Sequence, residues 1–285
     1  MPISQDKKYQ LVEKFVQTPA GRSKLAASMT MPLRTQRDYK AVGRRAYLVQ
    51  QLSAGALPLY DRDPDVTAYV VGEEGEGIIS VAKSKRVFFP IFEIASVPEV
   101  PITEIKQRRF DLVLRMQDKA KSEIMLKEDV RAFAIMDAAA NAANNPNAPL
   151  ATTAPVTANF ISDAMGNIER HRLRVARMFF NPKDFADVRK FGRDVYSPEE
   201  LQTLMKTGLQ GVIYGAQVIT TPQADQGKIY LCGEKEFFGR VPVRTELTVI
   251  SADRPWDRVI GFSCFENLGF GIHNNFAQQT IEVSR

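Results

Sequence analysis

Two cysteines and two histidines are the side chains of this 285-residue chain that could support nucleophilic catalysis. A thiol hydrolase would need Cys232 or Cys264 beside His171 or His273, because a nucleophile requires an activating base at hydrogen-bonding distance and a third group that orients the base. Nothing in the sequence brings these residues together. Both cysteines lie in apolar stretches, which favours a role as small core residues, and their spacing does not match a metal site or a disulfide framework. The sequence therefore predicts a protein that is not an enzyme and has no metal site.

A glycine-rich segment, residues 72–77, is the next candidate for ligand chemistry. Its spacing is not that of a phosphate-binding loop, and no Lys-Ser/Thr pair follows it. Its carboxylates, Glu73, Glu74 and Glu76, would repel a phosphate, and their spacing does not match a calcium-binding EF-hand loop. We expect no cofactor. The segment is either a solvated turn or a source of salt bridges to another subunit.

The charge balance is mildly basic, with a formal net charge of +5 and a pI near 9.1. The densest basic group is Arg170, Arg172, Arg174 and Arg177, next to Glu169. A solvated charged face accounts for this group, and non-specific attraction to polyanions remains open as an alternative. No apolar run approaches the roughly 18 residues that span a bilayer, and the polar N-terminus does not resemble a secretory signal. A cytoplasmic protein is therefore expected.

The N-terminal residues 1–45 have the pattern of an arm. Residues 4–16 predict a short amphipathic helix, and nothing periodic follows over residues 26–36. Such a segment buries little on its own, so it needs a partner. We expect the apolar face of the helix to contact another subunit; its residues are Leu11, Val12, Phe15 and Val16.

Residues 56–92 predict a long β-hairpin with the glycine-rich segment 72–77 as its turn. The returning strand carries Lys83, Lys85 and Arg86, in contrast to the acidic tip. A two-stranded hairpin of this length is only marginally stable alone, so it needs a surface to lie on. The three tip glutamates and the three basic residues are accordingly expected at a contact between subunits.

The rest of the chain predicts a long helix followed by alternating strands and helices. The helix covers residues 103–143, with an apolar stripe of Leu112, Met116, Ala120 and Ile124, and a break is expected near residues 122–127. A second stripe is expected beyond the break, formed by Leu126, Val130, Phe133 and Ala134. Helices are then predicted at 159–170, 181–190 and 197–208, and strands at 175–180, 212–214, 217–220, 229–232, 241–249 and 259–265.

This order of elements resembles the Hong Kong 97-like fold of the major capsid proteins of tailed bacteriophages. Residues 174–182 (RVARMFFNP) resemble the family's buried strand that ends in Asn-Pro, residues 211–218 (GVIYGAQV) its small-residue strand, and residues 257–262 and 273–277 its terminal strands and tail. The resemblance covers nearly the whole chain. It implies an α+β fold with an N-terminal arm (1–45), an extended loop (56–92), a peripheral domain with a spine helix (93–145 and 235–268) and an axial domain (146–234 and 269–285).

The resemblance also implies a function. The chain would assemble as hexamers and pentamers into an icosahedral head shell that encloses double-stranded DNA, in a virion assembled in the host cytoplasm. Its partners would be its own copies, a portal protein, separate scaffolding and decoration proteins where these are used, and the packaged DNA through non-specific contacts. Residues 1–45 leave no room for a long cleaved scaffolding segment, and Lys83, Lys85 and Asn267 match no covalent cross-linking motif. Two alternatives stay open, an encapsulin-like nanocompartment shell and a polyanion-binding protein.

Overall fold

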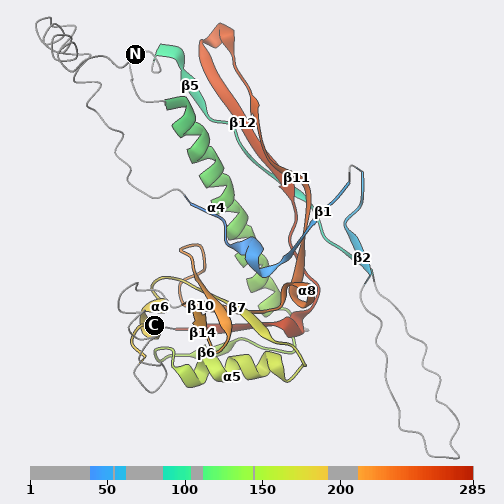
Figure 1. Ribbon diagram of the computed structural model, residues 1–285, viewed down its shortest axis with the longest axis vertical. Helices are drawn as coiled ribbons and strands as arrows, with labels where there is room; N and C mark the ends of the chain where they lie inside the picture. The colour runs from blue at the N-terminus through green and yellow to red at the C-terminus, as the bar shows by residue number, and fades with distance from the viewer. Residues whose placement is uncertain are drawn as a thin grey trace, which may run out of the picture. The chain divides into compact units, whose positions relative to one another are not determined.

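The computed structural model describes residues 39–53, 55–61, 86–103, 112–143, 145–191 and 211–284. The chain forms two compact units. Unit 1 comprises Met1–Lys40, Ala95–Ile124 and Leu247–Phe265, and unit 2 comprises Ala41–Ile94, Met125–Glu246 and Glu266–Arg285. Helices and sheets both contribute (Figure 1), which confirms the α+β class.

Unit 2 contains a six-stranded sheet in the order β6-β14-β10-β7-β9-β8. The central strand β10 pairs antiparallel with β14 and β7, while β7–β9 and β14–β6 are parallel pairs. The strands are β6 (Leu150–Thr152), β7 (Val175–Phe180), β8 (Val212–Ile213), β9 (Ala216–Thr220), β10 (Lys228–Gly233) and β14 (Gln278–Val283).

Both faces of this sheet are buried, which explains the nearly continuous apolar runs of β7 and β10. On one face lies α5 (Ala158–Glu169), whose Ile161 and Ile168 belong to the same core as Met178 of β7. On the other face, Phe179 and Tyr230 pack with Phe133, at ring-centroid distances of 5.5 and 5.4 Å from it. Unit 2 is therefore built in layers around this sheet.

The second core also holds the last residues of the predicted arm and those that follow them. η1 (Gly43–Ala46) leads into Tyr47, whose buried ring lies 5.0 Å from that of Phe238 and 5.3 Å from that of Phe270. Phe238 ends the short helix α8 (Lys235–Phe238). The aromatic contacts thus fix residues 43–47 to the body of unit 2.

A second six-stranded sheet runs in the order β1-β11-β12-β4, with β13 paired to β11 and β5 paired to β12. β1 is parallel to β11, in the register Leu48↔Arg240 to Gln51↔Val243. A separate two-stranded ribbon joins β2 and β3 antiparallel. These strands are β1 (Leu48–Gln51), β2 (Leu59–Asp61), β3 (Arg86–Phe88), β4 (Phe92–Ser96), β5 (Glu99–Pro101), β11 (Gly239–Ser251), β12 (Val259–Leu268) and β13 (Gly271–Ile272).

The long helix is α4 (Leu112–Ala140), and it is uninterrupted where a break was expected near residues 122–127. The predicted second stripe is confirmed only in part, because Phe133 is buried whereas Val130 and Ala134 are exposed. Buried side chains also continue the first stripe at four-residue steps, in the order Ala120, Ile124, Glu128, Ala132, Met136 and Ala140, with Asp129 and Phe133 buried beside them. The stripe seemed to change phase because a glutamate occupies one of its buried positions.

Most other predicted elements are confirmed with small shifts in their bounds. The strand predicted at 241–249 is β11, and the helix at 159–170 is α5, capped by the Thr157 hydroxyl, which accepts from the Phe160 N–H. The helix predicted after Asn181 shortens to α6 (Phe185–Val188), and residues 150–152, expected in a loop, form β6. The helix predicted at 197–208 lies outside the described residues. The bounds proposed for the arm, extended loop, peripheral and axial domains remain predictions.

Candidate functional site

Arg44 is the centre of an ionic contact that joins several elements of unit 2. Its guanidinium contacts carboxylates from three different elements. Nε donates to Glu128 of α4, Nη1 donates to Glu246 of β11 at 3.2 Å, and Nη2 donates to Glu266 of β12 at 2.9 Å. One side chain on η1 therefore ties the start of the described chain to a helix and two strands.

Because two of the three carboxylates are buried, the pKa values of Arg44 and of these carboxylates depend on one another. The side chains of Glu128 and Glu266 are each 2% exposed, whereas Glu246 is 50% exposed. Desolvation raises the pKa of Glu128 to about 7, even though the hydrogen bond and charge of Arg44 favour the ionised form. Desolvation also raises the pKa of Glu266. Burial alone would lower the pKa of Arg44, but the surrounding carboxylates outweigh it and raise that pKa.

Asp129 holds the backbone that precedes Arg44. Its buried carboxylate accepts from the N–H groups of Val42, at 2.9 Å, and Gly43, at 2.7 Å. A Cβ on Gly43 would lie 2.7 Å from Asp129 Oδ1 and 2.9 Å from the Cβ of Ala132, so this close approach requires a glycine. Val42 to Arg44 and the adjacent acids Glu128 and Asp129 form a cluster that we call the arm anchor.

The β2–β3 ribbon belongs to unit 2, and one of its faces packs on other residues of that unit. Tyr60 faces inward, with its ring 5.1 Å from that of Phe89 and the Arg240 guanidinium 5.2 Å from its centroid. The other face exposes the cross-strand pair Leu59–Phe88 and the ion pair Asp61–Arg86, at 2.9 Å. The predicted hairpin strands are therefore paired antiparallel at their base.

Most of the predicted contact residues lie outside the part of the chain that the structure describes. Those that lie outside the described residues are Leu11, Val12, Phe15, Val16, Glu73, Glu74, Glu76, Lys83 and Lys85. Arg86 is described, and its partner is Asp61 of the same chain. Its role in a contact between subunits stays a prediction.

The sequence reasoning missed the arm anchor. It did not single out Arg44, Glu128 or Asp129. The available signal was the adjacent pair Glu128 and Asp129 in the apolar stripe of the long helix. A buried carboxylate needs a cationic or N–H partner, so this pair indicated such a partner from elsewhere in the chain.

Neither cysteine has the lowered thiol pKa that a nucleophile needs. Burial raises the pKa of the Cys232 thiol well above its usual range and also raises that of Cys264. Of the two histidines, His171 contacts Phe276 in a tilted arrangement, with 4.5 Å between ring centroids, and accepts from Arg170 at 3.1 Å. Among the described residues, no group of three or more His, Cys, Asp or Glu side chains could hold a metal ion, and no described helix is long and apolar enough to cross a membrane.

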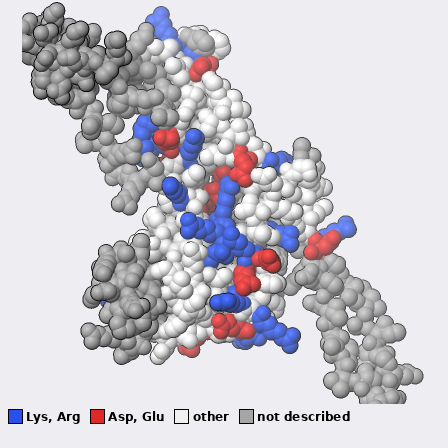
Figure 2. All heavy atoms as spheres, viewed as in Figure 1, with Lys and Arg blue, Asp and Glu red and all other residues white. Residues whose placement is uncertain are grey.

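The predicted arginine group is mostly exposed. Arg170, Arg172 and Arg174 are exposed and Arg177 is half-buried. Arg170 also donates to the carbonyl of Pro146 and to Asn147 Oδ1. On the face that Figure 2 shows, Lys and Arg side chains are interspersed with Asp and Glu side chains. Among the described residues of that face, the basic side chains gather mainly near its centre, and acidic side chains lie close to them.

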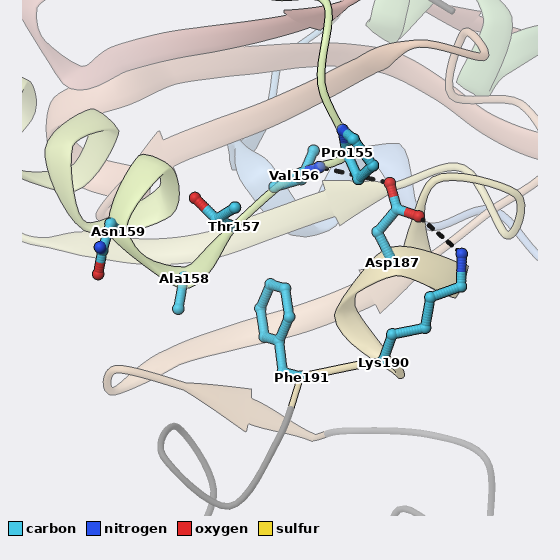
Figure 3. Close-up of a pocket in the computed structure, with 8 residues that line it drawn as sticks. All are labelled: Pro155, Val156, Thr157, Ala158, Asn159, Asp187, Lys190 and Phe191. Atoms are coloured by element: carbon cyan, nitrogen blue, oxygen red, sulfur yellow. Dashed lines mark hydrogen bonds and ion pairs between the residues drawn. The ribbon is translucent and has the colours of Figure 1, made fainter.

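A pocket of about 360 Å³ lies beside the N-terminus of α5 (Figure 3). Asp187 of α6 accepts from the Val156 N–H at 3.4 Å and pairs with Lys190 at 3.2 Å, so its charge is already engaged. Phe191 and Pro155 contribute apolar surface. These contacts join α6 to the segment before α5 and indicate packing more than ligand chemistry.

No protein-family model and no curated protein matches the chain. Solved structures do match. The capsid of cyanophage P-SCSP1u is similar at 8% identity and a TM-score of 0.69, over 90% of this chain and 91% of that one. The mature capsid of bacteriophage PhiM1 is similar at 8% identity and a TM-score of 0.68, over 90% of this chain and 91% of that one. A virus-like particle from Pyrococcus furiosus is similar at 16% identity and a TM-score of 0.56, over 86% of this chain and 93% of that one. The chain therefore has the fold of these capsid proteins, which confirms the Hong Kong 97-like fold.

Proposed function

We propose that this chain is the major capsid protein of a tailed bacteriophage and assembles into the icosahedral head shell around double-stranded DNA. The observation that carries the proposal is the share of the chain that aligns with phage capsid chains. About nine tenths of this chain aligns with about nine tenths of two phage capsid chains, so the likeness extends well beyond a shared central sheet. The sequence motifs that resemble the family in chain order support the same function.

The two appendages give the proposal its physical basis. The ribbon β2–β3 exposes the apolar pair Leu59–Phe88, and a two-stranded ribbon is marginally stable in isolation. The predicted arm ends at an anchor that fixes its last residues to unit 2. In a shell, each appendage would lie on a neighbouring subunit, and many weak contacts would add up through closure.

The finer parts of the proposal concern domains and partners. Residues 93–145 and 235–268 would form the peripheral domain, and residues 146–234 and 269–285 the axial domain at the centre of hexamers and pentamers. A portal protein, scaffolding and decoration proteins, and non-specifically bound DNA would be the other partners. The virion would be its location, after assembly in the host cytoplasm. Its role would be structural and not enzymatic, which is supported by the raised pKa of both thiols.

An encapsulin-like compartment is the second candidate. The likeness to the archaeal virus-like particle supports it, but the TM-score of 0.56 is lower than the 0.69 and 0.68 of the two phage capsids. The contents of the particles distinguish the two functions, because one encloses a genome and the other encloses protein cargo.

The test is to express the chain alone and measure its sedimentation and the nucleic acid that its particles retain after nuclease treatment. We expect large closed particles, or hexameric and pentameric rings as intermediates. A stable monomer at high concentration would contradict the proposal. Particles that consistently co-purify with a protein cargo from their native host would favour the compartment.

A further inference from the structure

The buried face of the large sheet in unit 2 ends at an arginine. Phe179 of β7 pairs in register with Tyr230 of β10, and both side chains are buried in the second core. Two residues earlier on β7, and therefore on the same face of the strand, lies the half-buried Arg177. Its neighbours in register are Cys232, which is buried, and Gln217, which is exposed. Arg177 thus lies at the margin of the core, between its buried and its solvent-exposed side.

The guanidinium of Arg177 has no partner among the residues that the structure describes. Its Nε is buried and makes no hydrogen bond. Burial lowers the pKa of Arg177, and only a thiolate at Cys232 would offset that change. Burial raises the pKa of this thiol well above its usual range, so the thiol is neutral and supplies no charge. A buried donor of a charged group without an acceptor costs folding free energy, which an anion at this position would recover.

A second arginine lies close enough to repel the first. Arg45 of η1 is exposed, and its charge lowers the pKa of Arg177 beyond the larger effect of burial. The adjacent residues Ala46 and Tyr47 belong to the same core as Phe179, so η1 is fixed at this end of the sheet. Within the described ranges, the Arg45 side chain also forms no ion pair. Two cations held together without an acid between them form a site for an anion.

Phosphate matches the chemistry of this site. The planar guanidinium fork binds phosphate oxygens through two parallel hydrogen bonds, and the exposed amide of Gln217 adds a further N–H donor on the same face. The preceding arginine is not available, because three carboxylates already contact Arg44. Arg45 and Arg177 are therefore the cations that remain for a ligand. A nucleic-acid backbone presents phosphates along its whole length and needs no base-specific contact to bind such a pair.

We propose that Arg45 and Arg177, together with the amide of Gln217, form a contact for the phosphate backbone of double-stranded DNA. The proposal rests on the proposed shell function, which supplies the DNA, and it assigns the non-specific contact to particular residues. Of the basic group at residues 170–177, it includes Arg177 alone. The exposed Arg172 and Arg174 lie outside the contact and serve as its control.

The test measures the binding of a short labelled DNA duplex to the dispersed full-length chain by fluorescence anisotropy, over a series of salt concentrations. Each phosphate contact contributes about 0.9 to the slope of log K against log salt concentration. R45Q combined with R177Q should therefore reduce the slope by about 2 and weaken binding at low salt by about tenfold or more. R172Q combined with R174Q removes the same charge and should leave the slope nearly unchanged. An unchanged slope in the first double variant, or equal reductions in both, would overturn the inference.

Two more variants guard against a loss of fold. R45Q alone changes an exposed side chain, should leave the circular dichroism spectrum unchanged, and should reduce the slope by about 1. R45K combined with R177K keeps both charges without the planar fork, so it should keep the slope and lose part of the affinity. A glutamate peptide that displaces the duplex at equal concentration of charge would overturn the inference, because the site would then take carboxylates equally well.

Sedimentation of the same preparations reports on the shell function separately. Particles that form from a chain whose salt slope is unaffected by R45Q and R177Q would overturn this inference and leave the shell function standing. A chain that shows the expected changes in slope but never assembles would support the DNA contact and contradict the shell function.

Discussion

Glu128 is expected to destabilise the folded chain when it is ionised, and Glu128→Gln isolates this effect. The group is buried on α4 beside Asp129 and Glu266, with one guanidinium shared among several carboxylates. Its pKa in the folded chain is about 7 against 4.5 for the free side chain. The folded state therefore holds a proton that the unfolded state releases between pH 4.5 and 7, and the free energy of unfolding falls as pH rises through that window.

The size of the effect follows from the same values. A rise in pKa from 4.5 to about 7 corresponds to about 3 kcal/mol between the two protonation states. Glutamine resembles the protonated acid and can still accept from Arg44. E128Q should therefore unfold with the wild-type free energy near pH 4.5 and be up to about 3 kcal/mol more stable at pH 8.

The assay is urea unfolding of dispersed protein, followed by far-UV circular dichroism between pH 4.5 and 8. Glu246→Gln is the matched control, since its side chain contacts the same guanidinium but is half-exposed, and it should change stability by less than about 1 kcal/mol. A variant E128Q that is less stable than the wild type at pH 8 would refute the reasoning, because the ionised pair with Arg44 would then be a net stabiliser.

The remaining predictions concern the arm anchor, the arm and the loop. Arg44→Ala should destabilise the chain by about 3–5 kcal/mol at pH 8, because it leaves buried carboxylates without their cation, whereas the exposed neighbour Arg45→Ala should cost little in the same urea titration. Gly43→Ala should cost about 1–3 kcal/mol because of the close Asp129 oxygen, while Gly166→Ala, with open space around its Cβ on α5, should be neutral or stabilising; equal effects would contradict the role of close approach. Deletion of residues 1–25 should leave the body folded but impair shell formation. Normal shells by electron microscopy would show that the arm does not hold neighbouring subunits together. Changing Glu73, Glu74 and Glu76 together to lysine should leave the melting temperature of dispersed protein nearly unchanged and lower the shell yield most at low salt, where charges are least screened; an unchanged yield there would indicate a solvated turn.

The sequence was most informative where local pattern and burial coincide. The strands β7 and β10 have apolar runs because both faces of their sheet are covered, and the alternation over residues 241–249 predicted most of β11. The helix after Asn181 is shorter than predicted, because the cap at Asn181 is followed by turns and only Phe185–Val188 is helical. A local cap signal does not determine how far a helix continues.

The arm anchor could not be derived from local pattern. Arg44 meets Glu246 and Glu266 across about 200 residues of chain, a pairing that no local pattern encodes. Glu128 made the stripe of α4 seem to change phase, since a hydrophobicity pattern treats a glutamate as exposed. Only the fold shows that a guanidinium from η1 donates a hydrogen bond to it. The predicted contact residues of the arm and loop tip lie outside the described residues and remain predictions.

Negative-stain electron microscopy of the purified chain, expressed alone and together with any scaffolding protein encoded beside it, tests the central claim most directly. The account predicts closed hollow shells, or rings of six and five subunits. Dispersed single subunits at high concentration under both conditions, from a chain that circular dichroism shows to be folded, would contradict it.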